Sequence, residues 1–91
     1  MPITIMDRKG NVCPAVCHVS RGAVRQVEWI SRGDNAVIAF NGPSPLVPPG
    51  PFAVAPGPPV VTPLDPLALG AYKYSVVGSE GTTDPIIVVD R

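Results

Sequence analysis

GAYKYSVV at residues 70–77, followed by DPIIVV at residues 84–89, is the stretch of this sequence that decides the fold. Both segments are rich in β-branched and aromatic residues, and a polar loop with two glycines separates them. These residue types favour strands, and glycine-containing polar loops favour turns. The stretch therefore predicts two strands of a β-sandwich in the last third of the chain.

Four earlier segments carry the same kind of pattern, at residues 3–5, 12–20, 23–31 and 36–41. Glycine, asparagine and aspartate separate them at a spacing of roughly ten residues, which is typical of an all-β sandwich or barrel. Val27 and Trp29 share one face by the two-residue period of a strand. Because Pro14 cannot donate a ladder hydrogen bond, the second segment should begin near Ala15 or lie at a sheet edge.

Residues 42–69 differ from the rest because they hold most of the 13 prolines. We expect a long proline-rich connection with a short strand at residues 52–55 and another near residues 60–62. Leu64, Leu67 and Leu69 should then pack beneath the connection. The alternative is a disordered linker or a ligand for an SH3-type domain, since Pro-x-x-Pro occurs at residues 45–48 and 48–51. Frequent apolar residues between the prolines, and the lack of a flanking arginine, favour the ordered connection.

Length and charge limit the classes of function. The chain has 91 residues, of which 45% are hydrophobic and 15% charged, so a single domain over residues 1–91 with a packed core is expected. Seven basic and seven acidic residues give a formal net charge of zero. Without a basic field, nucleic acid is not an expected partner, and near-neutrality gives little protection against self-association.

The N-terminal residues show no basic start followed by a long apolar stretch, so we expect no secretory signal and a cytoplasmic protein. A signal removed before this sequence begins stays open as an alternative. All apolar runs are short, so no membrane insertion is expected.

Trp29, AVIAF at residues 36–40, GAYKYSV at residues 70–76 and the final DPIIVV together resemble the cupredoxin-like domain family. The likeness is to small bacterial cupredoxin-like proteins with a tyrosine-rich strand, an acidic turn and a last strand led by Asp-Pro. It covers about residues 13–89. The resemblance implies a Greek-key β-sandwich of seven or eight strands.

The resemblance also implies where a copper site would be. Blue-copper members carry a cysteine on the tyrosine-bearing strand, then a histidine and a weak axial methionine, with another histidine upstream. Val76 stands at the cysteine position, and the following loop at residues 78–83 has neither histidine nor methionine. The loop after Phe40 has no histidine either. We therefore expect the scaffold without type 1 copper and without another cofactor.

Cys13, Cys17 and His18 form the one cluster of soft ligands. On a strand the two cysteines would share a side about 13 Å apart, too far for a disulfide, and His18 would face the other way. The preferred interpretation is two buried cysteines that act as small hydrophobic residues. The alternative is a metal- or haem-binding redox protein that uses these three residues, with Pro14 bending the segment.

No spacing of serine, histidine and carboxylate indicates a catalytic site, so we expect no enzyme. We expect instead a non-catalytic, copper-free interaction or structural module that binds a protein partner or a second copy of itself. Its working surface should lie on the proline-rich connection. The expected surface residues are Leu46, Val47, Phe52, Val60 and Val61.

Overall fold

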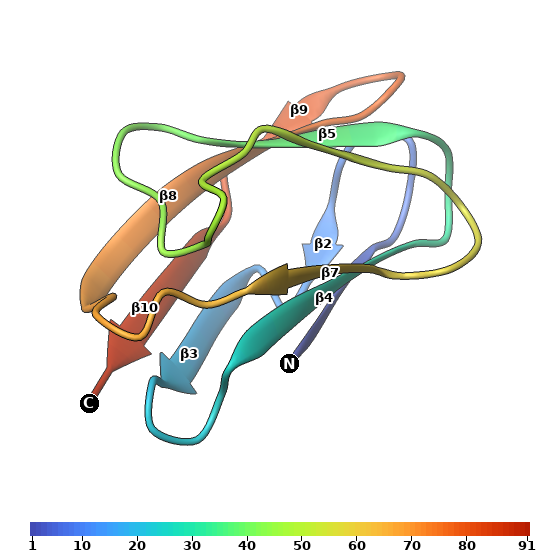
Figure 1. The fold of residues 1–91 in the computed structure, drawn as a ribbon. Helices are drawn as coiled ribbons and strands as arrows, with labels where there is room; N and C mark the ends of the chain where they lie inside the picture. Colours follow the sequence, from blue (N-terminus) through green and yellow to red (C-terminus); the bar gives the residue numbers. More distant parts are fainter.

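Buried and exposed side chains alternate along the strands of this protein, which a computed structural model describes over residues 1–91. Val27 and Trp29 are buried while Glu28 between them is not, as the two-residue period predicts. The chain forms ten strands and no helix (Figure 1). In chain order they are β1 Pro2–Ile5, β2 Val12–Cys13, β3 Val16–Ser20, β4 Gln26–Ser31, β5 Ala36–Phe40, β6 Phe52–Val54, β7 Val60–Pro63, β8 Gly70–Val77, β9 Thr82–Thr83 and β10 Ile86–Asp90.

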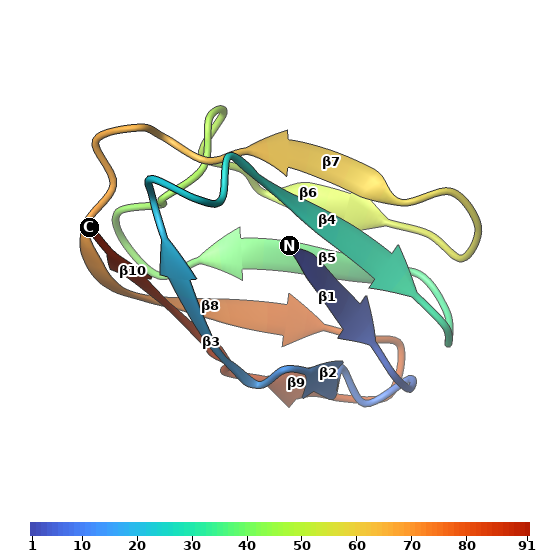
Figure 2. The ribbon, with the colours of Figure 1, turned by 90° about the horizontal axis from the view of Figure 1, so that it is seen from below.

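The strands form two mixed sheets that face one another (Figure 2). The four-stranded sheet has the order β2-β1-β4-β7, and the six-stranded sheet has the order β3-β10-β8-β5-β6, with β9 added to β8. The β1–β4 and β3–β10 pairs are parallel and the others antiparallel. Eight strands have at least three residues, while β2 and β9 have two each. The expected all-β Greek-key sandwich is confirmed. The short strands β2 and β9 add to the eight longer strands.

The strand expected to begin near Ala15 or to lie at a sheet edge is confirmed, since β3 begins at Val16 and is an outer strand of its sheet. The segment at residues 12–20 also holds a second, short strand. Its first part is β2 in the four-stranded sheet, and its second part is β3 in the six-stranded sheet. The chain crosses from one sheet to the other at Pro14 and Ala15. Proline cannot donate to a ladder, so this is the point where pairing with β1 ends and the corner forms.

An aromatic cluster fills the core between the sheets. Tyr74 packs edge-on against Trp29, with ring centroids 5.4 Å apart, and lies 5.2 Å from Phe40. Trp29 Nε1 donates to Thr62 Oγ1 at 2.9 Å, which ties β4 to β7 inside the core. The Tyr74 hydroxyl is buried without a hydrogen-bond partner. Burial also raises the pKa of Tyr74 far above its usual value, so this phenol stays protonated.

The register of β8 decides which loops meet at each end of the sandwich. Its first half pairs with β10 and its second half with β5. Phe40 lies opposite Tyr74, and Val37 lies opposite Val77. The end of β8 is therefore beside the start of β5, while the loop after Phe40 lies at the other end of the sheet.

The proline-rich connection is held to the chain beyond β7 by backbone pairing. Leu46 forms an antiparallel bridge with Leu64, and Val47 N donates to the Pro63 carbonyl at 3.0 Å. This pairing turns the Leu46 and Leu64 side chains into the core. Leu67 and Leu69 were expected to pack beneath the connection, but they are 81% and 46% exposed. They lie beyond the bridge, where the chain turns outward toward β8.

The structure contains no helix that is long and apolar enough to span a membrane.

Candidate functional site

Three turns meet where β8 ends, at residues 7–11, 32–35 and 78–81. We call them the turn cluster. Glu80 N donates to the Arg8 carbonyl at 2.8 Å, and Thr83 Oγ1 donates to the Gly10 carbonyl. Gly33 packs against the backbone of Asp7. The turns therefore bind one another largely through main-chain groups.

Glycine makes this close packing possible. A Cβ on Gly78 would overlap the carbonyl oxygen of Arg8, and a Cβ on Gly10 would lie 2.5 Å from the carbonyl oxygen of Val76. Gly10 also has a φ of +84°, in the left-handed region that favours glycine. Main-chain atoms thus pack tightly where these turns touch, while Asn35, Gly78 and Ser79 also border an open groove beside the turns.

Asp7 braces the first turn of the cluster. Its carboxylate accepts hydrogen bonds from Asn11 Nδ2 at 2.9 Å, from Lys9 N at 3.0 Å and from Asn11 N at 3.2 Å. The side-chain bond from Asn11 is the largest of the causes that lower the pKa of this carboxyl. A carboxylate that accepts three hydrogen bonds from its own turn stabilises that turn, so we assign Asp7 a structural role.

The residues at this end do not fit a type 1 copper site. Val76, at the position where copper-binding members carry cysteine, is fully buried and apolar. From the sequence, the upstream histidine of a copper site was expected in the loop after Phe40. In the structure that loop lies at the other end of the sheet, and the loop before β5, at residues 32–35, lies beside the end of β8. Residues 32–35 and 78–83 contain no histidine, cysteine or methionine. No group of three or more His, Cys, Asp or Glu residues is arranged to hold a metal ion.

Cys13, Cys17 and His18 are not brought together. Cys13 is exposed on β2, whereas Cys17 is buried on β3 in the other sheet. His18 is on the outer face of β3, opposite to Cys17 as the strand period requires. Burial raises the pKa of the Cys17 thiol, which makes it less reactive. The expectation of two buried cysteines is right for Cys17 and wrong for Cys13, because the corner at Pro14 moves Cys13 to another sheet.

The five residues expected on the proline-rich surface divide into three groups. Leu46 is only 2% exposed and belongs to the core, so its expected exposure is wrong. Phe52 and Val60 are partly buried against the core. Val47 and Val61 are about half exposed, at 50% and 48%. They lie at the β7 edge, because Val47 binds the Pro63 carbonyl and Val61 shares the outer face of β7 with Pro63.

A shallow apolar groove on the outer face of the six-stranded sheet was not expected from the sequence. It has a volume of about 430 Å³, and Val37, Ala53, Ala55 and Val77 line its apolar part. The available signal was AVIAF at residues 36–40, where apolar residues occupy both faces of the strand instead of one.

No protein-family model matches the chain, and no curated protein matches its sequence. Among solved structures, the chain is similar to a novel purple cupredoxin from Nitrosopumilus maritimus, with a TM-score of 0.64 and 14% identity over 98% of both chains. It is also similar to a proline-to-glycine mutant of amicyanin in a reduced Cu(I) form at pH 4. That match has a TM-score of 0.53 and 20% identity, over 97% of this chain and 81% of the other. At such identities the likeness establishes the fold alone.

Proposed function

This chain has a cupredoxin-like fold, and we propose that it is a non-catalytic, copper-free interaction module. The observation that carries the proposal is the turn cluster. Main-chain atoms pack closely around Gly10, Gly33 and Gly78 where β8 stops, and the three turns there contain no histidine, cysteine or methionine. Without a bound ion, we expect the domain to act through its surface.

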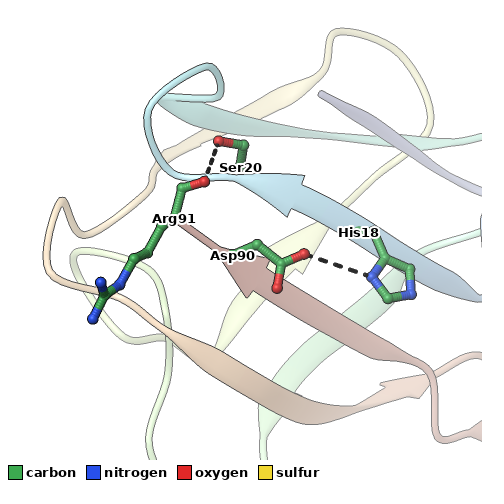
Figure 3. A network of polar contacts seen from close by, with 4 residues as sticks. All are labelled: His18, Ser20, Asp90 and Arg91. Atoms are coloured by element: carbon green, nitrogen blue, oxygen red, sulfur yellow. Dashed lines mark hydrogen bonds and ion pairs between the residues drawn. The ribbon is translucent and has the colours of Figure 1, made fainter.

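The polar residues on β3 and β10 support a role without catalysis (Figure 3). His18, Ser20 and Asp90 share the outer face of the six-stranded sheet. His18 Nδ1 lies 4.0 Å from Asp90 Oδ2, but Ser20 Oγ donates to the Arg91 carbonyl at 2.9 Å and not to the imidazole. A serine activated by a histidine whose Nδ1 faces a carboxylate would donate to the other ring nitrogen, Nε2. The His18 and Asp90 side chains are about two-thirds exposed, at 67% and 69%, so water screens their interaction.

The surface proposed for a protein partner is the β7 edge, with Val47 and Val61 at its centre. Leu46 belongs to the core, and Phe52 and Val60 are partly buried against the core. The connection is tied down at Leu46 and Val47, so docking would order few additional residues. An interaction that needs little ordering loses less entropy on binding. Self-association is the second part of the proposal, since a chain with zero net charge does not repel its own copies.

The proposal is tested by comparing what the protein and its variants retain from extracts of the native host. Val47→Glu and Val61→Glu place charges on the proposed surface. Val77→Glu is the control, because Val77 has similar exposure but lies on the other sheet. Quantitative mass spectrometry should find one or a few proteins held by the wild type and by Val77→Glu, and lost from the other two variants. Equal retention by all four proteins would argue against this surface.

The copper-free part of the proposal has a separate test. Calorimetric titration with Cu(II) and Cu(I) should show no stoichiometric binding at the turn cluster. A bound copper lost on substitution of a residue in the turn cluster would overturn the proposal. A metal or haem lost on Cys17→Ser would favour the redox alternative.

A further inference from the structure

The four outer strands of the two sheets are not equally protected against pairing with another chain. Strand β2 has two residues, β6 is flanked by Pro51 and Pro56, and β7 contains Pro63 and is covered at that residue by Val47. Short strands, prolines and covering loops are the usual protection of sheet edges. Strand β3 has five residues and contains no proline and no Asp, Glu, Lys or Arg. It is the one long edge without such protection.

The open side of β3 presents a defined set of backbone groups. In its parallel pairing with β10, alternate residues of β3 bond to the neighbour. Ile86 N donates to the Ala15 carbonyl, and Arg21 N donates to the Asp90 carbonyl, so the odd-numbered residues face β10. The N–H and C=O groups of Val16 and His18 therefore point away from the sheet. The Ser20 carbonyl is already used, because it accepts bonds from the turn that follows.

Two side-chain contacts on the outer face join β3 to β10 and the chain end that follows it. Asp90 lies beside His18, and the Ser20 hydroxyl binds the Arg91 carbonyl (Figure 3). These side chains lean toward β10 and leave the open side of β3 uncovered. Val16, at the start of the strand, is 58% exposed. The edge is thus regular, partly apolar and accessible.

We propose that β3 pairs antiparallel with β3 of a second copy across a two-fold axis, which joins two six-stranded sheets into one. This inference deepens the self-association part of the proposed function. The register that uses the free groups places Val16 opposite His18 of the second copy, and the reverse. Each of the four free N–H and C=O groups then has a partner, because the set is complementary to itself.

A second copy fits this edge better than an unrelated strand does. The other edges of the chain are short, proline-flanked or covered, so β3 of another copy is the one open strand that this protein itself supplies. Pairing of identical strands is isologous and closes after two copies, so no filament follows. The zero net charge and the absence of charged residues in β3 remove repulsion. A single strand pair buries less than the roughly 1,200 Å² of a stable complex, so the dimer should be weak.

The test is the mass of the purified chain by light scattering or analytical ultracentrifugation, from about 10 μM to about 1 mM, a range suited to weak complexes. The wild type should pass from a 9.5 kDa monomer toward a dimer. Val16→Lys should weaken dimerisation at least about tenfold, because lysine is a natural block on edge strands. Val37→Lys should not, because Val37 is an exposed valine of the same sheet away from this edge.

Hydrogen exchange gives an independent measurement. The His18 amide should exchange quickly in dilute solution and slow as concentration rises, while amides in the turn cluster stay unchanged. A monomer throughout the range with an unchanged His18 amide would overturn the inference. So would a dimer that Val37→Lys dissociates and Val16→Lys does not. Protection of His18 by a foreign extended peptide, without dimerisation, would show a different occupant and also overturn it. None of these outcomes depends on Val47 or Val61, so the partner surface is judged separately.

Discussion

The turn cluster and the β3 edge differ in how their backbone N–H and C=O groups are hydrogen-bonded. At the turn cluster, carbonyls of Arg8 and Gly10 accept bonds from neighbouring turns, and Gly78 packs directly on main-chain atoms. At β3, the N–H and C=O groups of Val16 and His18 have no partner within the chain. One region is satisfied internally and the other is satisfied only by water or by another strand.

This difference indicates where the molecule can bind something. A region whose backbone is already paired gains nothing from a new partner, whereas an unpaired edge exchanges water for protein at little cost. The turn cluster therefore offers few free backbone groups, whereas the outer side of β3 offers the N–H and C=O groups of Val16 and His18.

The largest effect should come from proline on β3. Val19→Pro removes a donor that faces β10 and should lower the free energy of unfolding by about 2–4 kcal/mol, through the lost bond and the carbonyl left unpaired. His18→Pro should be tolerated, because that N–H faces outward, but it should prevent dimerisation. Urea denaturation and light scattering measure the two effects. Equal losses of unfolding free energy in Val19→Pro and His18→Pro would mean that the two backbone N–H groups do not differ as described.

A methyl group in the turn cluster should be the next most costly change. Gly78→Ala forces Cβ onto the Arg8 carbonyl and should lower the free energy of unfolding by about 1–3 kcal/mol. Gly22→Ala is the control, since its nearest neighbour is the Ser20 hydroxyl at 3.8 Å. Denaturation midpoints measure both. A Gly78→Ala protein as stable as Gly22→Ala would mean that this end has free space.

Thr83→Val removes the side-chain bond to the Gly10 carbonyl while keeping the shape of the side chain. The expected loss is about 1 kcal/mol, the usual net contribution of such a bond. Thermal unfolding followed by circular dichroism measures it. Thr82→Val, in the same short strand but exposed, should change little. Equal effects would place the stabilisation in the strand instead of in the bond.

The Tyr74 hydroxyl is a polar group without a hydrogen-bond partner in the core, away from the open edge of β3. Removing it shows what such a buried group costs. Tyr74→Phe should leave the free energy of unfolding unchanged or raise it by up to about 1 kcal/mol, since no bond is lost.

The pH dependence of the wild type follows from the raised pKa of Tyr74. The unfolded chain ionises this phenol near its usual pKa of 10.0 while the folded chain does not. Its contribution is therefore present below that pH and is lost as pH rises above it. Denaturation at increasing alkaline pH should show a loss in the wild type that is absent in Tyr74→Phe. A stability loss at neutral pH in the variant would instead indicate a partner for the hydroxyl.

The smallest effect should be the loss of stability at low pH that comes from the Asp7 carboxylate in the first turn. The pKa of Asp7 is lowered from 3.8, chiefly by the bond from Asn11. Its contribution to stability is present above that value and is lost as pH falls through the lowered pKa. Asp7→Asn should flatten this part of the acid unfolding curve. An unchanged acid curve would mean that the turn holds without the carboxylate.

The local pattern of the sequence determined the strands and the fold class. Alternation around Trp29, the aromatic run ending in Val77 and the turns rich in glycine and asparagine predicted an all-β sandwich or barrel, because burial on one face enforces a period of two. The Greek-key topology came from the resemblance to the cupredoxin-like family. The missing soft ligands were equally visible, since they depend on residue type alone. His18 and Cys17 were placed on opposite faces for the same reason.

What needed the tertiary structure was the pairing of segments far apart in the chain. The corner at Pro14 separated Cys13 from Cys17, the bridge to Leu64 turned Leu46 inward, and the register of β8 moved the relevant upstream loop to residues 32–35. Which edge stays open also depends on the order of strands in each sheet. Periodicity reports the two faces of one strand, but long-range contacts choose its neighbours and therefore decide which backbone groups remain free.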